Sequence, residues 1–310
     1  MSASPAEIVK KPQKHHEFNK YSRIEVRPIP GPAGAEVSCG DVRKLDAEAI
    51  AEIRQAWLDH LALVFHGQKL DDNELTEFAR IFGEPEKAPP PADVMKARGR
   101  DNEYIAVISN VVENGVAIGS LGNDEAVWHT DMSYNSIPPA ASLLHALEVT
   151  AAGGETGIAN MYQALAELPE DLVKQVAGLT IYNDGSYNSA GQRRLNTESA
   201  SHPIIRTHPD TGLNALYLGR RPRARINELS EEESERMLNL LWKHASQEKF
   251  SWHHSWKVGD ILVWDNRCTM HHRNAFDSTE RRIMHRAQTK GSFLIKATSV
   301  GEIHQRYAMA

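Results

Sequence analysis

The chain has 310 residues, 41% of them hydrophobic and 25% charged, which suits one large globular domain or two ordinary ones. Its formal net charge of −6 argues against a nucleic-acid partner, because a nucleic-acid-binding domain is expected to be basic. There is no run of about 18 apolar residues and no apolar signal segment at the start, so we expect no membrane partner and a cytoplasmic location. The two cysteines, Cys39 and Cys268, are expected to be reduced thiols.

Residues 1–20 are predicted to be a flexible tail, and residues 21–310 a single domain. Apolar spacing and capping residues predict most elements of the first third. In order they are a strand at Ile24–Val26, a helix capped by Asp46, a strand at Leu61–Phe65, a helix after Asp71 that stops by Gly83, and a strand at Tyr104–Ser109. Residues 86–100 and 110–126 are predicted loops, as are residues 183–201 further on.

The remaining two thirds predict fewer helices and more strands. The expected elements are a strand at Ser142–Val149, helices at Met161–Leu168 and Glu170–Leu179, a helix after a Ser230/Glu233 capping box that carries Met237, Leu240 and Leu241, and strands at Phe250–Trp256, Ile261–Trp264 and Arg281–Thr289. Helices thus cluster early, and the pattern lacks regular βαβ alternation. The predicted fold class is mainly β with flanking helices, best matched by a double-sheet jelly roll.

A set of metal ligands is indicated by His129 and Asp131, which a strand would place on one face because side chains repeat every two residues. His271, after a buried strand, is the expected third ligand, and the adjacent His272 is its competitor. Two histidines and one carboxylate leave three neighbouring positions open on an octahedral iron.

Two arginines near the C-terminal end indicate anion binding. On a strand, Arg282 and Arg286 would share a face, and inward guanidinium groups are costly to bury without an anion. The alternative is a solvated edge strand with surface arginines. A similar choice concerns Trp252, His254 and Trp256, which we expect to serve core packing rather than ligand contact.

The chain resembles the taurine dioxygenase/2,4-D dioxygenase (TauD/TfdA) family over roughly residues 24–291. The resemblance rests on five ordered motifs: His129-Thr130-Asp131, Pro138-Pro139, Gly153-Gly154-Glu155-Thr156, Trp264-Asp265-Asn266-Arg267 with His271, and Arg282 with Arg286. It implies a single catalytic domain with the double-stranded β-helix fold, a form of the jelly roll. It also implies an Fe(II)- and 2-oxoglutarate-dependent dioxygenase that consumes O2, releases succinate and CO2, and is a homo-oligomer.

The family's site residues carry over position by position. The resemblance implies that His129, Asp131 and His271 bind Fe(II). It assigns the distal carboxylate of 2-oxoglutarate to Thr156 and Arg282, and Gly153-Gly154 suits a tight turn that brings Thr156 toward the site, with an ordinary turn as the alternative. Arg286 would hold the anionic group, a carboxylate or sulfonate, of a small organic substrate. The carboxylate of Asp131 also implies hydroxylation rather than halogenation, sometimes with cleavage of an adjacent heteroatom bond.

The substrate itself is left open by the sequence. Where the family's taurine enzyme has a histidine and an asparagine that contact taurine, this chain has Glu86 and Glu125. These carboxylates would repel a sulfonate, could pair with an amine, or could be solvated loop residues. Met132, directly after Asp131, is expected to line the substrate pocket. Desaturation or oxidation at nitrogen on the same iron remain alternatives, as do, more remotely, a zinc hydrolase and a non-catalytic acid-binding relative.

Overall fold

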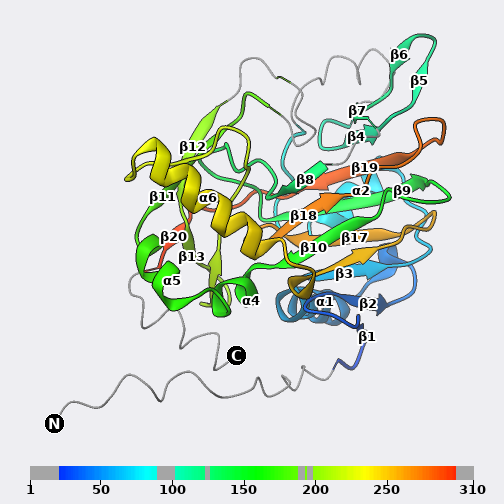
Figure 1. Cartoon of the computed structure of the whole chain (residues 1–310). Coiled ribbons are helices and arrows are strands. Elements are labelled where there is room, and N and C mark those ends of the chain that lie inside the picture. The colour runs from blue at the N-terminus through cyan, green and yellow to red at the C-terminus, as the bar shows by residue number, and fades with distance from the viewer. Residues whose placement is uncertain (1–20, 89–101, 123–125, 188–192, 194–197, 298–310) are drawn as a thin grey trace.

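The computed structural model describes residues 21–88, 102–122, 126–187, 193 and 198–297, so the predicted N-terminal tail and most of the 86–100 loop lie outside the described residues. The described chain is mainly β with a few helices (Figure 1). The helices are α1 (Ala47–His60), α2 (Asp72–Ala79), α4 (Met161–Ala166), α5 (Glu170–Val176) and α6 (Glu231–Ala245), with the 3-10 turns η2 (Val42–Lys44) and η3 (Glu248–Phe250).

Two sheets position the site. The larger has eight strands, and all its neighbouring strands are antiparallel except the pairs β2–β3 and β4–β7. In sheet order they are β1 (Glu25–Pro28), β2 (Ala35–Ser38), β3 (Ala62–Phe65), β17 (Ile261–Asp265), β9 (Ala141–Glu148), β19 (Ile283–Gln288), β4 (Ala106–Ser109) and β7 (Ser120–Leu121). The smaller has four strands, in the order β16 (Ser251–His254), β10 (Thr156–Asn160), β18 (Thr269–Arg273) and β8 (Ala126–His129).

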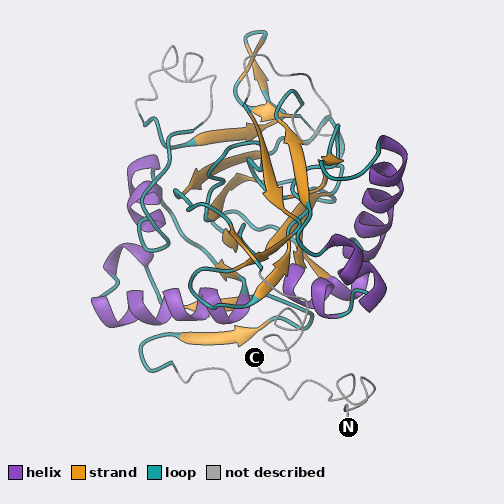
Figure 2. Ribbon diagram, turned by 90° about the vertical axis from the view of Figure 1, so that its left-hand side faces the viewer, coloured by secondary structure: helices purple, strands orange, loops and turns teal. Residues whose placement is uncertain are grey.

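Shorter strands complete the fold. They are β5 (Val112–Glu113) with β6 (Val116–Ala117), β11 (Thr180–Asp184) with β12 (Ser199–Pro203) and β15 (Arg225–Ile226), and β13 (Ile205–Thr207) with β14 (Asn214–Leu216) and β20 (Ile295–Lys296). Figure 2 shows the strands gathered in the middle of the molecule with helices on both sides. Among the described residues, no helix is both long and apolar enough to cross a membrane.

The larger sheet separates two apolar cores because its side chains alternate between faces. On β9, Leu143 packs toward α1 and α2, whereas Leu144 packs toward the other core. On β17, Ile261 and Val263 likewise face the helices, and Leu262 faces the opposite way. The face that carries Leu144 meets the smaller sheet, so the space between the two sheets is where the inward polar side chains gather.

Helix starts follow the predicted local signals. The Asp46 side chain accepts a hydrogen bond from the amide of Ala49 at the start of α1, and Asp71 and Glu74 form a reciprocal capping box on α2. The predicted Ser230/Glu233 box is also present at α6. Such a cap typically contributes about 1 kcal/mol, so residues close in sequence help to fix the starts of α1, α2 and α6.

Three expectations about the elements need correction. Helices do not cluster early: α4, α5 and α6 lie in the second half. The 110–126 loop contains the β5–β6 hairpin, whose Asn114-Gly115 turn has positive φ at both residues, as a type I′ turn requires. β11 and β12 pair with each other at the two ends of the predicted 183–201 loop. The sequence did not predict this pair because polar surface strands lack the apolar alternation of half-buried strands.

Candidate active site

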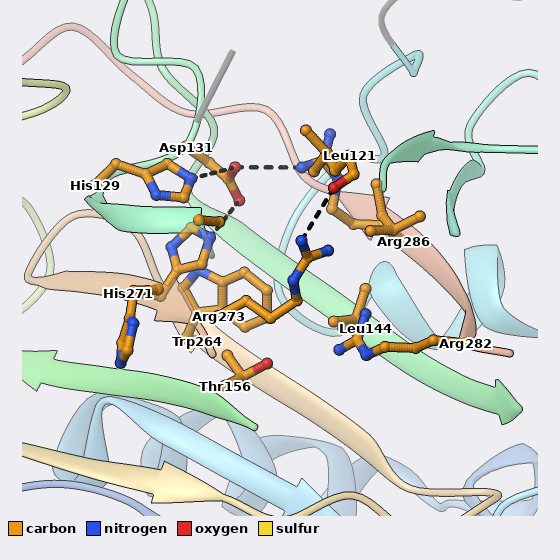
Figure 3. A pocket seen from close by; sticks show the side chains of 13 residues that line it. Leu121, His129, Asp131, Leu144, Thr156, Trp264, His271, Arg273, Arg282 and Arg286 are labelled. Atoms are coloured by element: carbon orange, nitrogen blue, oxygen red, sulfur yellow. Dashed lines mark hydrogen bonds and ion pairs between the residues drawn. The ribbon is translucent and has the colours of Figure 1, made fainter. Parts of the chain in front are cut away.

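The three predicted metal ligands meet between the two sheets. One ligand atom from each of His129, Asp131 and His271 lies within 4.8 Å of the others. The Nε2 atom of His129 is 3.9 Å from one carboxylate oxygen of Asp131, and Nε2 of His271 is 3.8 Å from the other (Figure 3). His129 and Asp131 are buried, and the His271 side chain is 12% exposed. The cluster is therefore compact and shielded from solvent.

Strand register brings the two imidazoles together. His271 on β18 is directly opposite His129 at the end of β8, and their ring centroids are 4.2 Å apart. Asp131 differs from the expectation, because β8 ends at His129 and Asp131 begins the following turn rather than sharing a strand face. The turn closes through a hydrogen bond from the amide of Asn135 to the carbonyl of Met132, whose φ is 44°.

His129 presents its Nε2 lone pair to the cluster. Its Nδ1 lies 2.7 Å from the carbonyl oxygen of Val127, which only accepts, so Nδ1 carries the proton and Nε2 does not. Burial and the neighbouring charge of His271 hold the pKa of His129 well below its usual value. Burial also lowers the pKa of His271. Both imidazoles are therefore neutral, the state in which histidine binds a metal.

The carboxylate of Asp131 is held from two sides. Ser142 donates to one oxygen at 2.8 Å, and Nη1 of Arg286 donates to the other at 3.2 Å. Burial by itself would raise the pKa of Asp131, but the charge of Arg286, with the hydrogen bond from Ser142, outweighs it and keeps the pKa below its usual value. Asp131 is therefore an anion, as a metal ligand must be.

A buried network that the sequence did not reveal orients this carboxylate. The Ser142 hydroxyl accepts hydrogen bonds from Asn266 at 2.8 Å and from Gln288 at 2.9 Å. With both lone pairs used, its single hydrogen is committed to Asp131. The indole of Trp264 in turn fixes Asn266 through a 3.0 Å bond to the amide oxygen. In the sequence, the motif at residues 264–267 is the one signal for this network, and it indicates only the family resemblance.

Three arginines line the same pocket. Arg282 and Arg286 were expected there, and Arg273 was not. Arg282 is 2% exposed, and no carboxylate of the described residues pairs with it. Burial and the charge of Arg273 lower the pKa of Arg282 to about 9. A cation buried at such a cost indicates an anion-binding site.

The predicted glycine turn and Thr156 lie beside Arg282. A Cβ on Gly153 would approach the carbonyl oxygen of Ala275 to 2.5 Å, and Gly154 has φ +71° and lies against the Arg282 side chain. Only glycine fits this close course, as expected. The turn leads into β10, where Thr156 is 3% exposed and lines the pocket. Thr156 and Arg282 therefore face the same space.

The remaining predicted residues have different placements. Glu86 is half-buried, and its Oε2 atom is buried with no hydrogen-bond partner among the described residues. Burial raises the pKa of Glu86, opposed by the charges of Lys290 and Arg286, so this carboxyl lies near Arg286. Glu125 lies outside the described residues. Met132 is half-buried in the turn after Asp131 and is absent from the described lining of the pocket.

His272 points away from His271, as adjacent strand residues do. Its Nε2 is 2.6 Å from Nε2 of His253, and its ring centroid is 4.1 Å from that of Trp128. A Cβ on Gly157 would collide with both imidazoles, so the glycine makes their contact possible. Trp252 and His254 are buried, as core packing requires, whereas Trp256 lies beyond the end of β16.

A second buried cluster, of His208, Asp265 and Cys268, has the spacing of a metal site. Its carboxylate is already engaged, because Arg267 donates two hydrogen bonds to Asp265 at 2.8 Å and His208 lies 3.0 Å from it. Burial would raise the pKa of Asp265, but the charge of Arg267 outweighs it and keeps the pKa below its usual value. This cluster is a structural ion pair.

We expect Asp265→Asn to lower the free energy of unfolding at pH 7 by roughly 3 kcal/mol, which is the lower end of the range for breaking a buried ion pair. The loss is at the lower end because Arg267 retains its ion pair with Asp210. The depressed pKa means that the stabilisation is present above the unfolded value of about 3.9 and is lost as pH falls below it. Urea unfolding at pH 7 and pH 3 tests this, with the deficit smaller at pH 3. The control Asp210→Asn, at a half-exposed partner, should cost under about 1 kcal/mol; equal losses for the two variants would contradict the prediction.

A mainly β fold with a buried two-histidine, one-carboxylate set beside an arginine-lined pocket is the arrangement of non-haem iron oxygenases that take an anionic co-substrate. The family described as "Taurine catabolism dioxygenase TauD, TfdA family" matches residues 25–288. The chain belongs to this family and is a 2-oxoglutarate-dependent dioxygenase.

Individual relatives agree with this assignment. The chain is 35% identical over 251 residues to the alpha-ketoglutarate-dependent 2,4-dichlorophenoxyacetate dioxygenase of Burkholderia sp. (strain RASC), covering 74% of this chain and 81% of the relative. It is 30% identical over 292 residues to the (S)-phenoxypropionate/alpha-ketoglutarate-dioxygenase of Sphingobium herbicidovorans, covering 86% and 95%. The crystal structure of AAD-2 in complex with Mn(II) and N-oxalylglycine superposes with a TM-score of 0.72 at 29% identity, covering 87% and 98%. Alpha-ketoglutarate is a synonym of 2-oxoglutarate.

Proposed function

We propose that the chain binds Fe(II) through His129, Asp131 and His271 and hydroxylates a C–H bond of a small anionic substrate, a carboxylate or sulfonate. 2-Oxoglutarate and O2 are consumed, and succinate and CO2 are released. Where the hydroxylated carbon bears a heteroatom, the product then loses that group. The observation that carries the proposal is Arg282, a buried cation with no described carboxylate partner in the pocket that contains the ligand cluster.

The donor set fits iron. The two neutral imidazoles of His129 and His271 and the carboxylate of Asp131 suit Fe(II) and would hold it. Iron bound there would supply the oxidation of the C–H bond, coupled to decarboxylation of 2-oxoglutarate. The chain's own contribution is to orient the ligands: Val127 fixes the tautomer of His129, and Ser142 fixes the rotation of the Asp131 carboxylate.

Thr156 and Arg282 are the proposed partners of the distal carboxylate of 2-oxoglutarate. Arg282 would supply a charge-assisted, bidentate contact, and Thr156 a hydroxyl donor. An anion at this position would also offset the cost of burying the Arg282 cation. Because both side chains are almost fully buried, water competes little for the same contacts.

Arg286 is the proposed partner of the substrate's anionic group. Its side chain is 13% exposed, and its Nε is buried without a hydrogen-bond partner among the described residues. It can therefore keep the Nη1 contact to Asp131 while other N–H groups bind an anion. Glu86 beside it favours a substrate that also carries a hydrogen-bond donor, and Met132 and Glu125 are proposed to lie along the same substrate.

The finer expectations about the whole molecule are also proposals. The two facing sheets support a double-stranded β-helix, or jelly roll, because the ligand-bearing strands of the small sheet pack against a larger antiparallel sheet. The extent of the family match supports a single catalytic domain over residues 21–310. A homo-oligomer remains our proposal from the resemblance, and a cytoplasmic location remains our proposal from the sequence.

Succinate formation tests the function. Protein loaded anaerobically with Fe(II) and 2-oxoglutarate is exposed to O2 with a panel of aryloxy acids, sulfonates, alkyl sulfates and amino acids. We expect substrate-dependent succinate, in equal amount to a hydroxylated or cleaved product. Activity that Zn2+ supports without O2 would instead indicate hydrolysis, and a product with a new double bond would indicate desaturation.

Arg286→Ala is expected to raise the KM of the primary substrate by roughly 30-fold or more, since truncating one partner of a buried charge pair costs about 2–5 kcal/mol. The affinity for 2-oxoglutarate should change far less. Steady-state succinate assays give the first quantity and calorimetric titration gives the second. If 2-oxoglutarate binding collapses while the substrate KM stays the same, Arg282 and Arg286 have the opposite roles.

A further inference from the structure

Trp256 lies just past the end of β16, and its indole contacts Thr156, which lines the pocket. Its Nε1 donates a hydrogen bond to the hydroxyl oxygen of Thr156 at 3.1 Å. We propose that Trp256 is a positioning residue: its N–H commits the Thr156 hydroxyl to donate its own hydrogen into the pocket, toward the distal carboxylate of 2-oxoglutarate. The inference rests on the proposed roles of Thr156 and Arg282, and adds a residue that the sequence indicated only as core packing.

Hydrogen-bond accounting supports this role. An indole N–H only donates, whereas a hydroxyl has one hydrogen and two lone pairs. In the contact with Trp256, Thr156 must therefore be the acceptor, and its hydrogen stays available. Among the described residues, no acceptor takes that hydrogen. A carboxylate, which only accepts, is the ligand group that fits a hydroxyl prepared in this way.

The same indole also lies against the second proposed carboxylate partner. The guanidinium carbon of Arg282 is 6.0 Å from the centroid of the Trp256 ring and 5.9 Å from that of Phe276. Contact with aromatic faces offsets part of the cost of burying a cation. Trp256 thus contacts both Thr156 and Arg282, so one side chain sets the separation between two donors that would share one carboxylate.

Trp256 is itself held in place by the turn between β16 and β17. The ring of His254 is edge-on to the indole, with centroids 4.7 Å apart and planes at 80°. Nε2 of His254 lies 3.0 Å from Asp260, and the same carboxylate oxygen accepts the amide of Lys257 at 3.0 Å. Asp260 is 1% exposed. The buried aspartate therefore fixes the residues on both sides of Trp256, which aims the indole N–H at Thr156.

Trp256→Phe tests the inference, because it keeps an aromatic ring and removes the N–H. Binding of 2-oxoglutarate to Mn(II)-loaded protein is measured by isothermal titration calorimetry, without primary substrate or turnover. We expect affinity to fall about 3- to 10-fold, the scale of one net hydrogen bond. In a Thr156→Val background, Trp256→Phe should cause no further loss. For 2-oxobutyrate, which lacks the distal carboxylate, affinity should be unchanged.

Trp252→Phe is the matched control. Trp252 is on β16, shortly before Trp256, contacts the same His254 ring, and has a buried Nε1 with no hydrogen-bond partner among the described residues. Its replacement should leave 2-oxoglutarate affinity unchanged. Circular dichroism confirms folding, and Trp256→Leu, which also lacks an N–H, replaces Trp256→Phe if the latter does not fold.

Each outcome decides between a positioning role and simple packing. Wild-type affinity in Trp256→Phe would overturn the inference, and so would an equal loss in the Thr156→Val background or an equal loss for 2-oxobutyrate. These results leave the proposed function standing as long as wild-type protein binds 2-oxoglutarate. If Mn(II)-loaded wild-type protein does not bind 2-oxoglutarate, it is the proposed function that fails.

Discussion

Replacing His271 with alanine is expected to abolish the weak visible charge-transfer band that Fe(II) and 2-oxoglutarate form anaerobically, whereas replacing His272 should leave the band. The reason is strand geometry, because the side chains of adjacent residues on β18 point to opposite faces. His271 meets Asp131 and His129, whereas His272 meets His253 and Trp128. Only the first can contribute to the proposed metal site.

The size of the effect should separate a ligand from a neighbour. Loss of a residue that supports a metal ligand typically costs about 10- to 100-fold in metal affinity, and loss of a ligand itself should cost more. Isothermal titration calorimetry with Mn(II) measures the metal affinity of both variants. His253→Ala serves as a control, because it removes the exposed partner of His272 and leaves every residue of β18 unchanged. A band that survives in His271→Ala and disappears in His272→Ala would show that His272, and not His271, is the metal ligand.

Local signals allowed much of the fold to be predicted. Helix caps depend on residues three apart, so Asp71 with Glu74 and Ser230 with Glu233 were recognisable without any tertiary information. The glycines at 153 and 154 were likewise predicted as a tight turn, and the structure adds what makes them necessary, the approach of Ala275 and Arg282. The Asn114-Gly115 hairpin was an equally local signal that was missed.

Long-range contacts could not be predicted from the sequence. Ser142 becomes important only because Gln288 and Asn266, each over 120 residues away, converge on its hydroxyl. No periodicity or spacing encodes that meeting. The contact between Trp256 and Thr156 spans 100 residues and likewise follows from sheet register and the turn after β16. The sequence placed the chemistry-bearing residues, but the groups that orient them depend on which strands become neighbours.

Arg282→Leu is expected to weaken 2-oxoglutarate binding by roughly 30-fold to several thousand-fold, corresponding to about 2–5 kcal/mol for one partner of a buried charge pair. The proposed distal carboxylate would lose its cationic partner and would face an apolar side chain in a nearly dry pocket. Calorimetric titration of Mn(II)-loaded protein measures the loss. 2-Oxobutyrate should bind the variant as well as it binds the wild type, because it has no distal carboxylate to lose.

Arg281→Leu is the matched control for the same substitution one residue earlier. The Arg281 side chain is 51% exposed and pairs with Glu148 on the surface, so its loss should leave 2-oxoglutarate binding unchanged. Stability provides a second, independent readout. Burial lowers the pKa of Arg282 to about 9, which means that desolvation of this cation makes the free energy of folding less favourable. Arg282→Leu should therefore raise the melting temperature of ligand-free protein while it removes the affinity, the pattern of a residue kept for binding at the expense of stability. A variant that both melts earlier and binds 2-oxoglutarate normally would contradict this role for Arg282.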